Sequence, residues 1–419
     1  MRCGEPWRTS LDAYEAVLAR RADSESDTGR NRINRPNALH SGSTAANRLR
    51  DSLVTYAIVS YENRRDLQDP LRFFEKLQPI HFYRHAPYGD VTHSEQERTI
   101  QYHHPYDLLQ KLRRAQPQIV QGGEPFVPRL IPYAWAELSY TRFARRPLVI
   151  PSFDNIPIAD QYGGAMAAAI RAAARPYVRS AALLIPANNG AEKNLRWAGA
   201  RPEQLVRMMY GTWGVDTSEF TPEGTHANLP GTGHRIVYLG RLVRYKGVFD
   251  LVAAMPRVLE RVSADLVFIG DGPEAGDLKQ AAQDAGVADR VHFLGVVENK
   301  DVPSYLRAAA VLAAPSRTTR RWAEQVGMSA MQALACGVPV VTNSSGSIPE
   351  FIEHDVTGLV VAEGMPDALA DAIARLLTND VMRGEFARRA REEAVRRYDA
   401  RKNIRAAEDR ILAATGYST

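Results

Sequence analysis

A helix that passes directly into a buried strand, near residue 330, constrains the fold of this chain most. Gly337 stands where a left-handed residue would end the helix, and Pro339 prevents the helix from resuming. The β-branched run 338–342 suits a strand that is buried on both faces. The preceding residues are good helix formers whose apolar side chains recur on one side, at Met328, Met331, Leu334 and Ala335. A helix followed at once by such a strand indicates a parallel α/β sheet.

Short apolar runs alternate with helical patterns along the rest of the C-terminal half. We expect strands at 235–239, 265–269, 291–294, 311–314, 338–342 and 359–361. Helical periodicity fills the intervals, as in a sheet built with right-handed crossovers. This half is therefore predicted to form a Rossmann-like domain.

The N-terminal half shows the same alternation in weaker form. Strands are expected at 53–60, 79–83, 118–120, 147–150 and 182–185. Helices are expected at 70–77, 106–115 and 165–178. A second parallel sheet follows from this pattern, and ligands bind such sheets at the carboxyl ends of their strands.

Composition narrows the class of protein and its partners. A chain of 419 residues is too long for one core, and its 45% hydrophobic and 24% charged residues are ordinary for a globular protein. A formal net charge of +5 favours anionic substrates, an anionic membrane surface or nucleic acid. No zinc spacing, RNA-binding motif or helix-turn-helix pattern accompanies the charge, which disfavours nucleic acid. Two distant cysteines and the lack of a signal peptide or a long apolar run favour the cytoplasm.

A basic loop flanked by glycine follows the first predicted strand of the C-terminal half. Gly240 ends that strand, and Arg241 and Lys246 come just before the next predicted helix. The amide groups at a helix N-terminus attract anions, and arginine and lysine add a fork and a point charge suited to phosphate. The loop is a candidate diphosphate site, although most basic loop residues are simply solvated.

The stretch around residue 330 also carries a spaced polar pair. Glu324 is followed by seven residues, then Gln332, then Ala-Leu-Ala-Cys-Gly-Val-Pro-Val-Val. This resembles the donor-sugar motif of the retaining GT-B glycosyltransferases of family 4, in which a second Glu stands where this chain has Gln332. The basic loop resembles that family's Gly-Arg-Leu-x-x-x-Lys-Gly pattern at every fixed position. Taken alone, the spaced pair fits an amphipathic helix with solvated polar ends equally well.

The resemblance is close over about 210–400 and loose over 50–210, and it implies an α/β, GT-B fold. In that fold two Rossmann-like domains face each other across a cleft. We therefore expect an acceptor domain at 49–213, a linker at 214–234 and a donor domain at 235–397. A final helix at about 398–419 is expected to cross back onto the first domain. Residues 1–48 lie outside the resemblance and are expected to be a disordered extension, or the product of a start codon chosen too far upstream.

The resemblance also implies roles in donor binding. Arg241 and Lys246 would neutralise the leaving nucleoside diphosphate, and Glu324 would hold hydroxyls of the reacting sugar; we expect these three to be catalytic. The other expected donor contacts are Gly240, Leu294, Gln332, Gly327, Ser345 and Gly346.

Two polar turns at strand ends are the candidates for the acceptor side. Gly123 and Glu124 follow one predicted strand, and Asp154 and Asn155 follow the next. Some family members carry similar residues at these turns. Strands also end in glycine, acidic and asparagine residues for turn reasons alone, so this assignment is open.

The expected activity is transfer of a hexosyl unit, with retention, from a nucleotide-diphospho-sugar to a hydroxyl of a glycan, lipid or small molecule. Neither a cofactor nor a metal is expected, because two cations and helix termini face the diphosphate. Contact with the inner membrane face through basic surface is a further expectation. Two alternatives stay open: a nucleotide-sugar-binding protein that has lost turnover, and a GT-B phosphorylase or epimerase.

Overall fold

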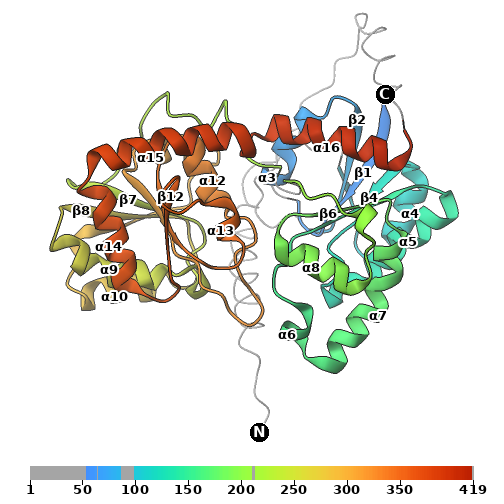
Figure 1. Ribbon diagram of the computed structural model, residues 1–419, viewed down its shortest axis with the longest axis horizontal. Helices are drawn as coiled ribbons and strands as arrows, with labels where there is room; N and C mark the ends of the chain where they lie inside the picture. The colour runs from blue at the N-terminus through green and yellow to red at the C-terminus, as the bar shows by residue number, and fades with distance from the viewer. Residues whose placement is uncertain (1–52, 64, 86–98, 210–212, 418–419) are drawn as a thin grey trace, which may run out of the picture.

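The computed structural model describes residues 53–63, 65–85, 99–209 and 213–417, and it consists of two parallel six-stranded sheets with helices around them (Figure 1). The strand orders are β3-β2-β1-β4-β5-β6 and β12-β11-β10-β7-β8-β9. Both are the order of a doubly wound Rossmann sheet, with the reversal at the first strand of each half. The prediction of two Rossmann-like domains is confirmed. The predicted disordered extension, 1–48, lies outside the described residues.

The N-terminal sheet is formed by the half of the chain in which the alternation of strand and helix patterns was weaker. Its strands are β1 (Val54–Val59), β2 (Leu77–Tyr83), β3 (Thr99–Gln101), β4 (Ile119–Gln121), β5 (Leu148–Ser152) and β6 (Leu183–Pro186). Its helices are α3 (Arg65–Gln68), α4 (Pro105–Ala115), α5 (Ile131–Ala144), α6 (Ile158–Tyr162), α7 (Gly164–Ser180) and α8 (Asn189–Ala198). The sequence patterns missed α5, because it is buried on most of its sides and so lacks a visible helical period.

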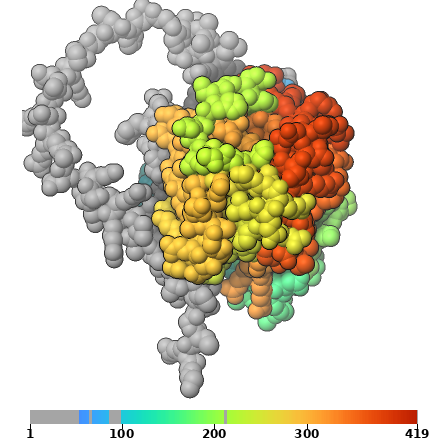
Figure 2. Space-filling model, turned by 90° about the vertical axis from the view of Figure 1, so that its left-hand side faces the viewer, coloured from blue at the N-terminus to red at the C-terminus, as the bar shows by residue number. Residues whose placement is uncertain are grey.

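The C-terminal sheet matches its sequence patterns closely. Its strands are β7 (His234–Leu239), β8 (Ala264–Ile269), β9 (Val291–Gly295), β10 (Val311–Ala314), β11 (Val340–Asn343) and β12 (Gly358–Val361). Its helices are α9 (Val248–Leu259), α10 (Ala275–Asp284), α11 (Val302–Arg307), α12 (Met328–Ala335), α13 (Ile348–Phe351), α14 (Pro366–Leu377) and α15 (Asp380–Glu393). Figure 2 looks onto this domain from the side remote from the N-terminal sheet.

The strand after α12 begins later than predicted. The amide of Val338 donates to the carbonyl of Ala333, 2.9 Å away, and the amide of Gly337 donates to that of Leu334. These two bonds close the helix end, with Gly337 at φ 68°, in the left-handed region. Val338 therefore still belongs to the helix cap, and β11 starts at Val340.

The helix predicted at 70–77 is wrong. Only a single 3₁₀ turn forms, at Asp69–Phe73, and β2 already begins at Leu77. The cause is a carboxylate more than 330 residues away in the chain. Glu408 Oε1 accepts hydrogen bonds from the backbone amides of Glu75, Lys76 and Leu77, at 3.0, 2.7 and 2.8 Å. Amides held from outside cannot donate within a helix, so the chain extends here.

Glu408 lies on α16 (Ala400–Thr415), the last helix, which crosses to the N-terminal domain (Figure 1). A π-helical turn, Ala394–Tyr398, separates α16 from α15. The apolar side of α16 is buried against β1 and β6, through Ala400, Ile404, Ala407, Ile411 and Leu412. The two domains are thus joined twice, by residues 213–233 and by α16. Within the described residues, no helix is long and apolar enough to cross a membrane.

We expect Glu408→Ala to lower the free energy of unfolding by about 3 kcal/mol, because three backbone amides, one of them buried, lose their acceptor. Chemical denaturation of the purified protein measures this change. Arg405→Ala, on the exposed side of α16, removes only a surface ion pair with Glu75 and should cost below about 1 kcal/mol. Equal losses in the two variants would show that the Glu408 contacts do not hold the helix in place.

Candidate functional site

The basic loop after β7 ends at a glycine whose position leaves no room for a side chain. The chain leaves β7 at Gly240, makes one 3₁₀ turn at Arg244–Lys246, and starts α9 at Val248. Gly247 has φ 70°, and a Cβ there would lie 1.8 Å from the carbonyl oxygen of Pro315. This close approach brings the loop against the carboxyl end of β10.

Lys246 and Glu324 form an ion pair at this point. Lys246 Nζ lies 2.7 Å from Glu324 Oε2, and the two side chains are only 22% and 14% exposed. The hydroxyl of Ser316 donates to the same carboxylate oxygen, at 2.7 Å. Two residues that are 78 positions apart in the chain therefore share one site at the carboxyl ends of β7 and β10. This edge of the sheet is where Rossmann-type domains bind nucleotides.

Two aromatic residues that the sequence analysis did not single out connect the cations. Arg241 donates to the hydroxyl of Tyr245, at 2.7 Å, and its guanidinium lies 5.8 Å from the Tyr245 ring. The Tyr245 ring packs on Trp322 with centroids 4.4 Å apart, and Lys246 Nζ lies 4.7 Å from the Trp322 ring. The structure thus gathers Arg241, Lys246 and Glu324 around one aromatic pair. A Tyr next to the Lys and a Trp two residues before the Glu were the available signals.

The backbone of Glu324 is held from both domains. Asn155 Nδ2 donates to the carbonyl oxygen of Glu324, at 2.6 Å, and Ser347 donates to the same oxygen through its amide and its hydroxyl. A Cβ on Gly346 would lie 2.3 Å from that oxygen and 2.5 Å from Asn155 Nδ2, so glycine is required. Asn155 was expected on the acceptor side, and the structure places it at the peptide that carries Glu324.

The remaining predicted donor residues fall into two groups. Ser345 is buried with its hydroxyl 3.4 Å from the Glu324 amide, and Gly327, at φ 70°, precedes the first residue of α12. Leu294 lies on β9 and is 36% exposed. Gln332 lies in the second turn of α12, in a small pocket with Arg72 and Asp216 at the junction of the domains. No side-chain contact joins Leu294 or Gln332 to the Lys246–Glu324 pair among the described residues.

A cavity of about 390 Å³ lies on the acceptor side, between the two domains. Gly123, Glu124 and Asp154 line it from the carboxyl ends of β4 and β5, and Gln325 and Val326 close it from the other domain. The cavity wall therefore includes the residue next to Glu324. Three of the four predicted acceptor-side residues share this cavity, and Asn155 is not in its lining.

Glu124 is almost fully buried at the base of the cavity. One carboxyl oxygen accepts from the hydroxyl of Ser152 and the other from the amide of Phe153, each at 2.9 Å. Burial, and then the nearby charge of Asp154, raise the pKa of Glu124 to about 8. Burial likewise raises the pKa of Glu137 to about 8 behind the cavity, where it contacts the Tyr177 hydroxyl and the Gly123 amide. Near neutral pH these groups exist largely as neutral acids.

His81, on β2, is a cavity residue that the sequence analysis missed. It is 2% exposed, it contacts Ser60 and Gln68, and burial lowers its pKa to about 4. A neutral imidazole is therefore available at the cavity wall. A lone histidine within a strand pattern gave no signal strong enough to separate it from a core residue.

The raised pKa of Glu124 predicts how stability depends on pH. Below about pH 4.5 the Glu124 carboxyl is protonated in both the folded and the unfolded protein. Between about pH 4.5 and 8 it is ionised only in the unfolded protein, so the free energy of unfolding falls as the pH rises. We expect the melting temperature to drop between about pH 5 and 8, and Glu124→Gln to reduce that drop, because glutamine mimics the neutral acid. Thermal melts across this range measure both. Glu192→Gln, at a surface pair with Arg196, should leave the profile unchanged; a Glu124→Gln profile as steep as the native one would contradict the assignment.

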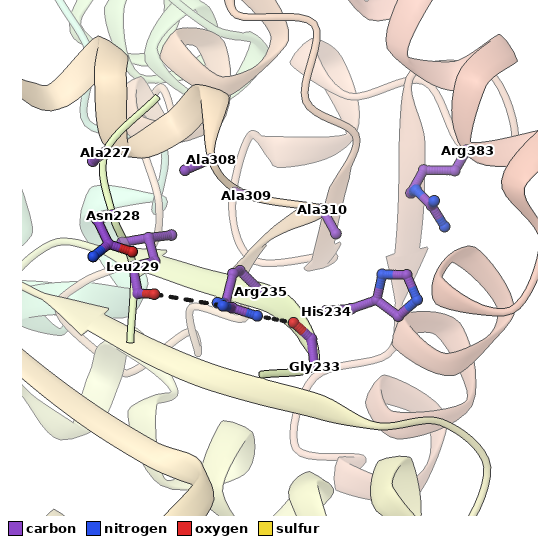
Figure 3. Close-up of a pocket in the computed structure, with 10 residues that line it drawn as sticks. All are labelled: Ala227, Asn228, Leu229, Gly233, His234, Arg235, Ala308, Ala309, Ala310 and Arg383. Atoms are coloured by element: carbon purple, nitrogen blue, oxygen red, sulfur yellow. Dashed lines mark hydrogen bonds between the residues drawn. The ribbon is translucent and has the colours of Figure 1, made fainter. Parts of the chain in front are cut away.

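A second cavity, of about 420 Å³, lies at the opposite edge of the C-terminal sheet (Figure 3). His234 and Arg235 begin β7 there, and Ala308 to Ala310 precede β10. The Arg235 guanidinium donates hydrogen bonds to backbone carbonyl oxygens of nearby residues, including that of Gly231 at 2.6 Å. An edge formed by the amino ends of the strands lacks the converging loops of a Rossmann site. We therefore place the candidate site at the Lys246–Glu324 pair.

Comparison with known proteins identifies the family that the C-terminal half resembles. The sequence profile of the family described as "Glycosyl transferases group 1" matches residues 225–394, which include the basic loop and Glu324. The C-terminal domain belongs to the glycosyl transferases group 1 family. The resemblance seen in the sequence is thus confirmed.

This chain spans about half the length of the curated relatives that it matches. A "GDP-mannose-dependent alpha-(1-6)-phosphatidylinositol monomannoside mannosyltransferase" of Mycobacterium tuberculosis is 41% identical over 173 residues, 39% of this chain and 45% of that protein. A "D-inositol 3-phosphate glycosyltransferase" of Xylanimonas cellulosilytica is 34% identical over 51% of this chain and 52% of that protein.

Solved structures establish the fold. Anabaena HepE, in complex with UDP and glucose, superposes with a TM-score of 0.70 at 17% identity, over 86% of this chain and all of that one. WaaG, described as a glycosyltransferase involved in lipopolysaccharide biosynthesis, superposes with a TM-score of 0.59 at 17% identity, over 85% of this chain and 99% of that one. These likenesses confirm that the chain has the predicted GT-B fold.

Proposed function

We propose that this group 1 protein is a glycosyltransferase that moves a hexosyl unit from a nucleotide-diphospho-sugar to an acceptor hydroxyl. The carrying observation is the Lys246–Glu324 pair, a cation and a carboxylate in contact, whose Glu324 directly precedes Gln325 at the wall of the interdomain cavity. The Lys246 and Arg241 side chains would bind the diphosphate. The Glu324 carboxylate would hold sugar hydroxyls, and the acceptor would enter through the cavity that Glu124 and Asp154 line.

We propose a retaining, metal-independent reaction at this site. As the diphosphate leaves, the sugar gains oxocarbenium character, and the acceptor hydroxyl attacks from the face that the diphosphate leaves. The departing phosphate takes the hydroxyl proton. Fixed charges that meet developing charge lower such a barrier most. Two cations around the Tyr245–Trp322 pair support the proposal that the chain itself can neutralise the diphosphate.

A thermal-shift screen against UDP, GDP and ADP sugars tests donor binding. A bound donor at about 100 times its dissociation constant stabilises the protein by about 2.7 kcal/mol. Slow release of nucleoside diphosphate with a donor that binds would support a transferase, and the anomeric configuration of a transferred sugar tests retention. A donor that binds and is never turned over would favour the alternative of a nucleotide-sugar-binding protein. Failure of every donor to bind would refute the proposal, and unchanged turnover in EDTA tests metal independence.

Gln332 bears on that alternative, because family 4 has a Glu at its position. We propose that its amide binds a ribose hydroxyl of the donor, so that Gln332→Ala raises the KM for donor more than it lowers kcat. If the protein instead binds nucleotide sugars without turning them over, the native chain should show no transferase activity, and Gln332→Glu should gain activity. Glutamate would also add a fourth carboxylate to a pocket that Asp69, Asp216 and Glu219 already line beside Arg72. Donor hydrolysis by the native chain and both variants separates these accounts.

We further propose that the protein acts in the cytoplasm, in contact with the inner membrane face. The support is a surface on α4 and α5, two helices that pack together, with Tyr106, Trp135 and Phe143 exposed by 62%, 43% and 81%. Four exposed arginines on the same helices, Arg113, Arg114, Arg142 and Arg145, form no ion pair within the described part of the chain. Aromatic side chains and cations together suit an anionic bilayer.

Sedimentation with phosphatidylglycerol vesicles tests this contact. Phe143→Asp and a double Arg142→Gln/Arg145→Gln variant should each bind such vesicles less, with no change for Val381→Asp, which alters an exposed apolar residue of the other domain. Equal sedimentation of all variants would refute the contact.

A further inference from the structure

Two arginines lie over one tyrosine ring at the wall of the acceptor-side cavity. Tyr61 follows β1, and both Tyr61 and Arg129 line the cavity. The Arg129 guanidinium lies 4.9 Å from the centre of the Tyr61 ring, and that of Arg84 lies 5.3 Å from it. Arg84 also donates to the Tyr61 hydroxyl, at 3.2 Å, and lies 5.5 Å from the Tyr133 ring. Contacts with the Tyr61 ring therefore hold both cations in place at this wall.

Neither guanidinium has a carboxylate partner within the described residues. Elsewhere in the molecule, Arg317 pairs with Asp250 and Arg257 with Asp371. Three acidic residues line the cavity, Glu62, Glu124 and Asp154, and none of them forms an ion pair with either guanidinium among the described residues. Glu124 binds Ser152 and Phe153, and Asp154 accepts from Gln161 Nε2 at 2.8 Å. Arg84 is half-buried, so water screens its charge only partly.

Unpaired cations at a cavity wall mark the place for an anion. A guanidinium presents several N–H donors in a planar fork, and phosphate offers three oxygens and up to two charges. The ring faces fix both guanidinium groups before a ligand arrives, which lowers the entropic cost of binding. The acceptor must carry its reactive hydroxyl toward Gln325 and Glu324 while another of its groups lies at Tyr61.

We infer that Arg84 and Arg129 bind a phosphate group of the acceptor, and that the acceptor is a hydroxyl compound carrying a phosphate ester. This inference rests on the proposed transferase function, since it assigns the second substrate of that reaction. The inference identifies the acceptor by the phosphate ester that the two arginines would recognise. The ester could belong to a small sugar or polyol phosphate, or to the headgroup of a lipid.

Calorimetric titration with matched pairs of ligands tests the inference: glucose and glucose 6-phosphate, and inositol and inositol 1-phosphate. Saturating nucleoside diphosphate fills the Lys246 site in each titration, so that the phosphate ester cannot bind there. We expect at least one phosphorylated member to bind about 10-fold or more tightly than its neutral partner. Vesicles with and without phosphatidylinositol provide the lipid arm of the same experiment.

The variants Arg129→Gln and Arg84→Gln should each remove most of that preference, in solution or on vesicles. Arg113→Gln, an exposed and unpaired arginine of the same domain, should keep it. Arg129 is exposed, so Arg129→Gln should fold even if Arg84→Gln does not. In that case Arg84→Lys is the substitute variant, because lysine keeps the positive charge and lacks the planar pair of N–H donors. No preference in either arm, or a preference that survives both substitutions, would overturn the inference. Nucleoside diphosphate binding, measured in the same samples, distinguishes this outcome from failure of the proposed donor site.

Discussion

Glu324→Gln should lower turnover of the donor by about 10²-fold or more, with the fold and most of the donor affinity retained. The carboxylate lies against Lys246 and Ser316, both at 2.7 Å, in a site that is largely shielded from water. Glutamine has nearly the same shape and can still accept one of these hydrogen bonds. It cannot supply the negative charge that meets the developing oxocarbenium. Steady-state donor hydrolysis, with nucleoside diphosphate release as the readout, measures the change.

Two controls make this experiment specific. Glu260→Gln removes an exposed carboxylate at the end of α9 and should leave both kcat and KM unchanged. Donor binding, followed by thermal shift, should change little in Glu324→Gln. Native turnover in this variant would refute the assignment of Glu324, whereas loss of the folded state would assign it a structural role instead.

Lys246→Ala should weaken binding of the nucleoside diphosphate by about 10- to 100-fold and leave the free nucleoside almost unaffected. A charge-assisted hydrogen bond of this kind contributes about 1.5–3 kcal/mol. Removing the lysine also leaves the Glu324 carboxylate without its cation, so an incoming phosphate would meet repulsion as well as a missing donor. Arg241→Ala should act in the same direction with a smaller effect, because its guanidinium is exposed.

Arg244→Ala is the matched control for these titrations. It lies in the same 3₁₀ turn, but its guanidinium pairs with Glu274, at 3.1 Å, and Asp277, at 3.2 Å, on the side of α10. We expect its diphosphate affinity to be native. Equal losses for nucleoside and diphosphate in Lys246→Ala, or an equal loss in Arg244→Ala, would mean that Lys246 does not bind the phosphates.

Local chemistry made the donor domain readable from the sequence. A left-handed glycine closing α12, a proline behind it and a buried β-branched run specify a helix and a strand through contacts that lie within a few residues. The Gly240–Gly247 loop was also readable, because its two glycines flank the turn in the sequence, although the contact that requires Gly247 is made with Pro315, far along the chain. Repetition of this pattern was enough to predict two Rossmann-like sheets.

Tertiary structure alone decided three other features. Glu408 takes the amides of residues 75–77 and so replaces a predicted helix with an extended chain. Asn155, expected beside the acceptor, contacts the carbonyl of Glu324 across the domain boundary. The cavity that contains His81, Glu124 and Arg129 has walls from strands, loops and both domains. Each of these depends on partners far apart in the chain, and a pattern read over ten or fifteen neighbouring residues contains no trace of such a partner.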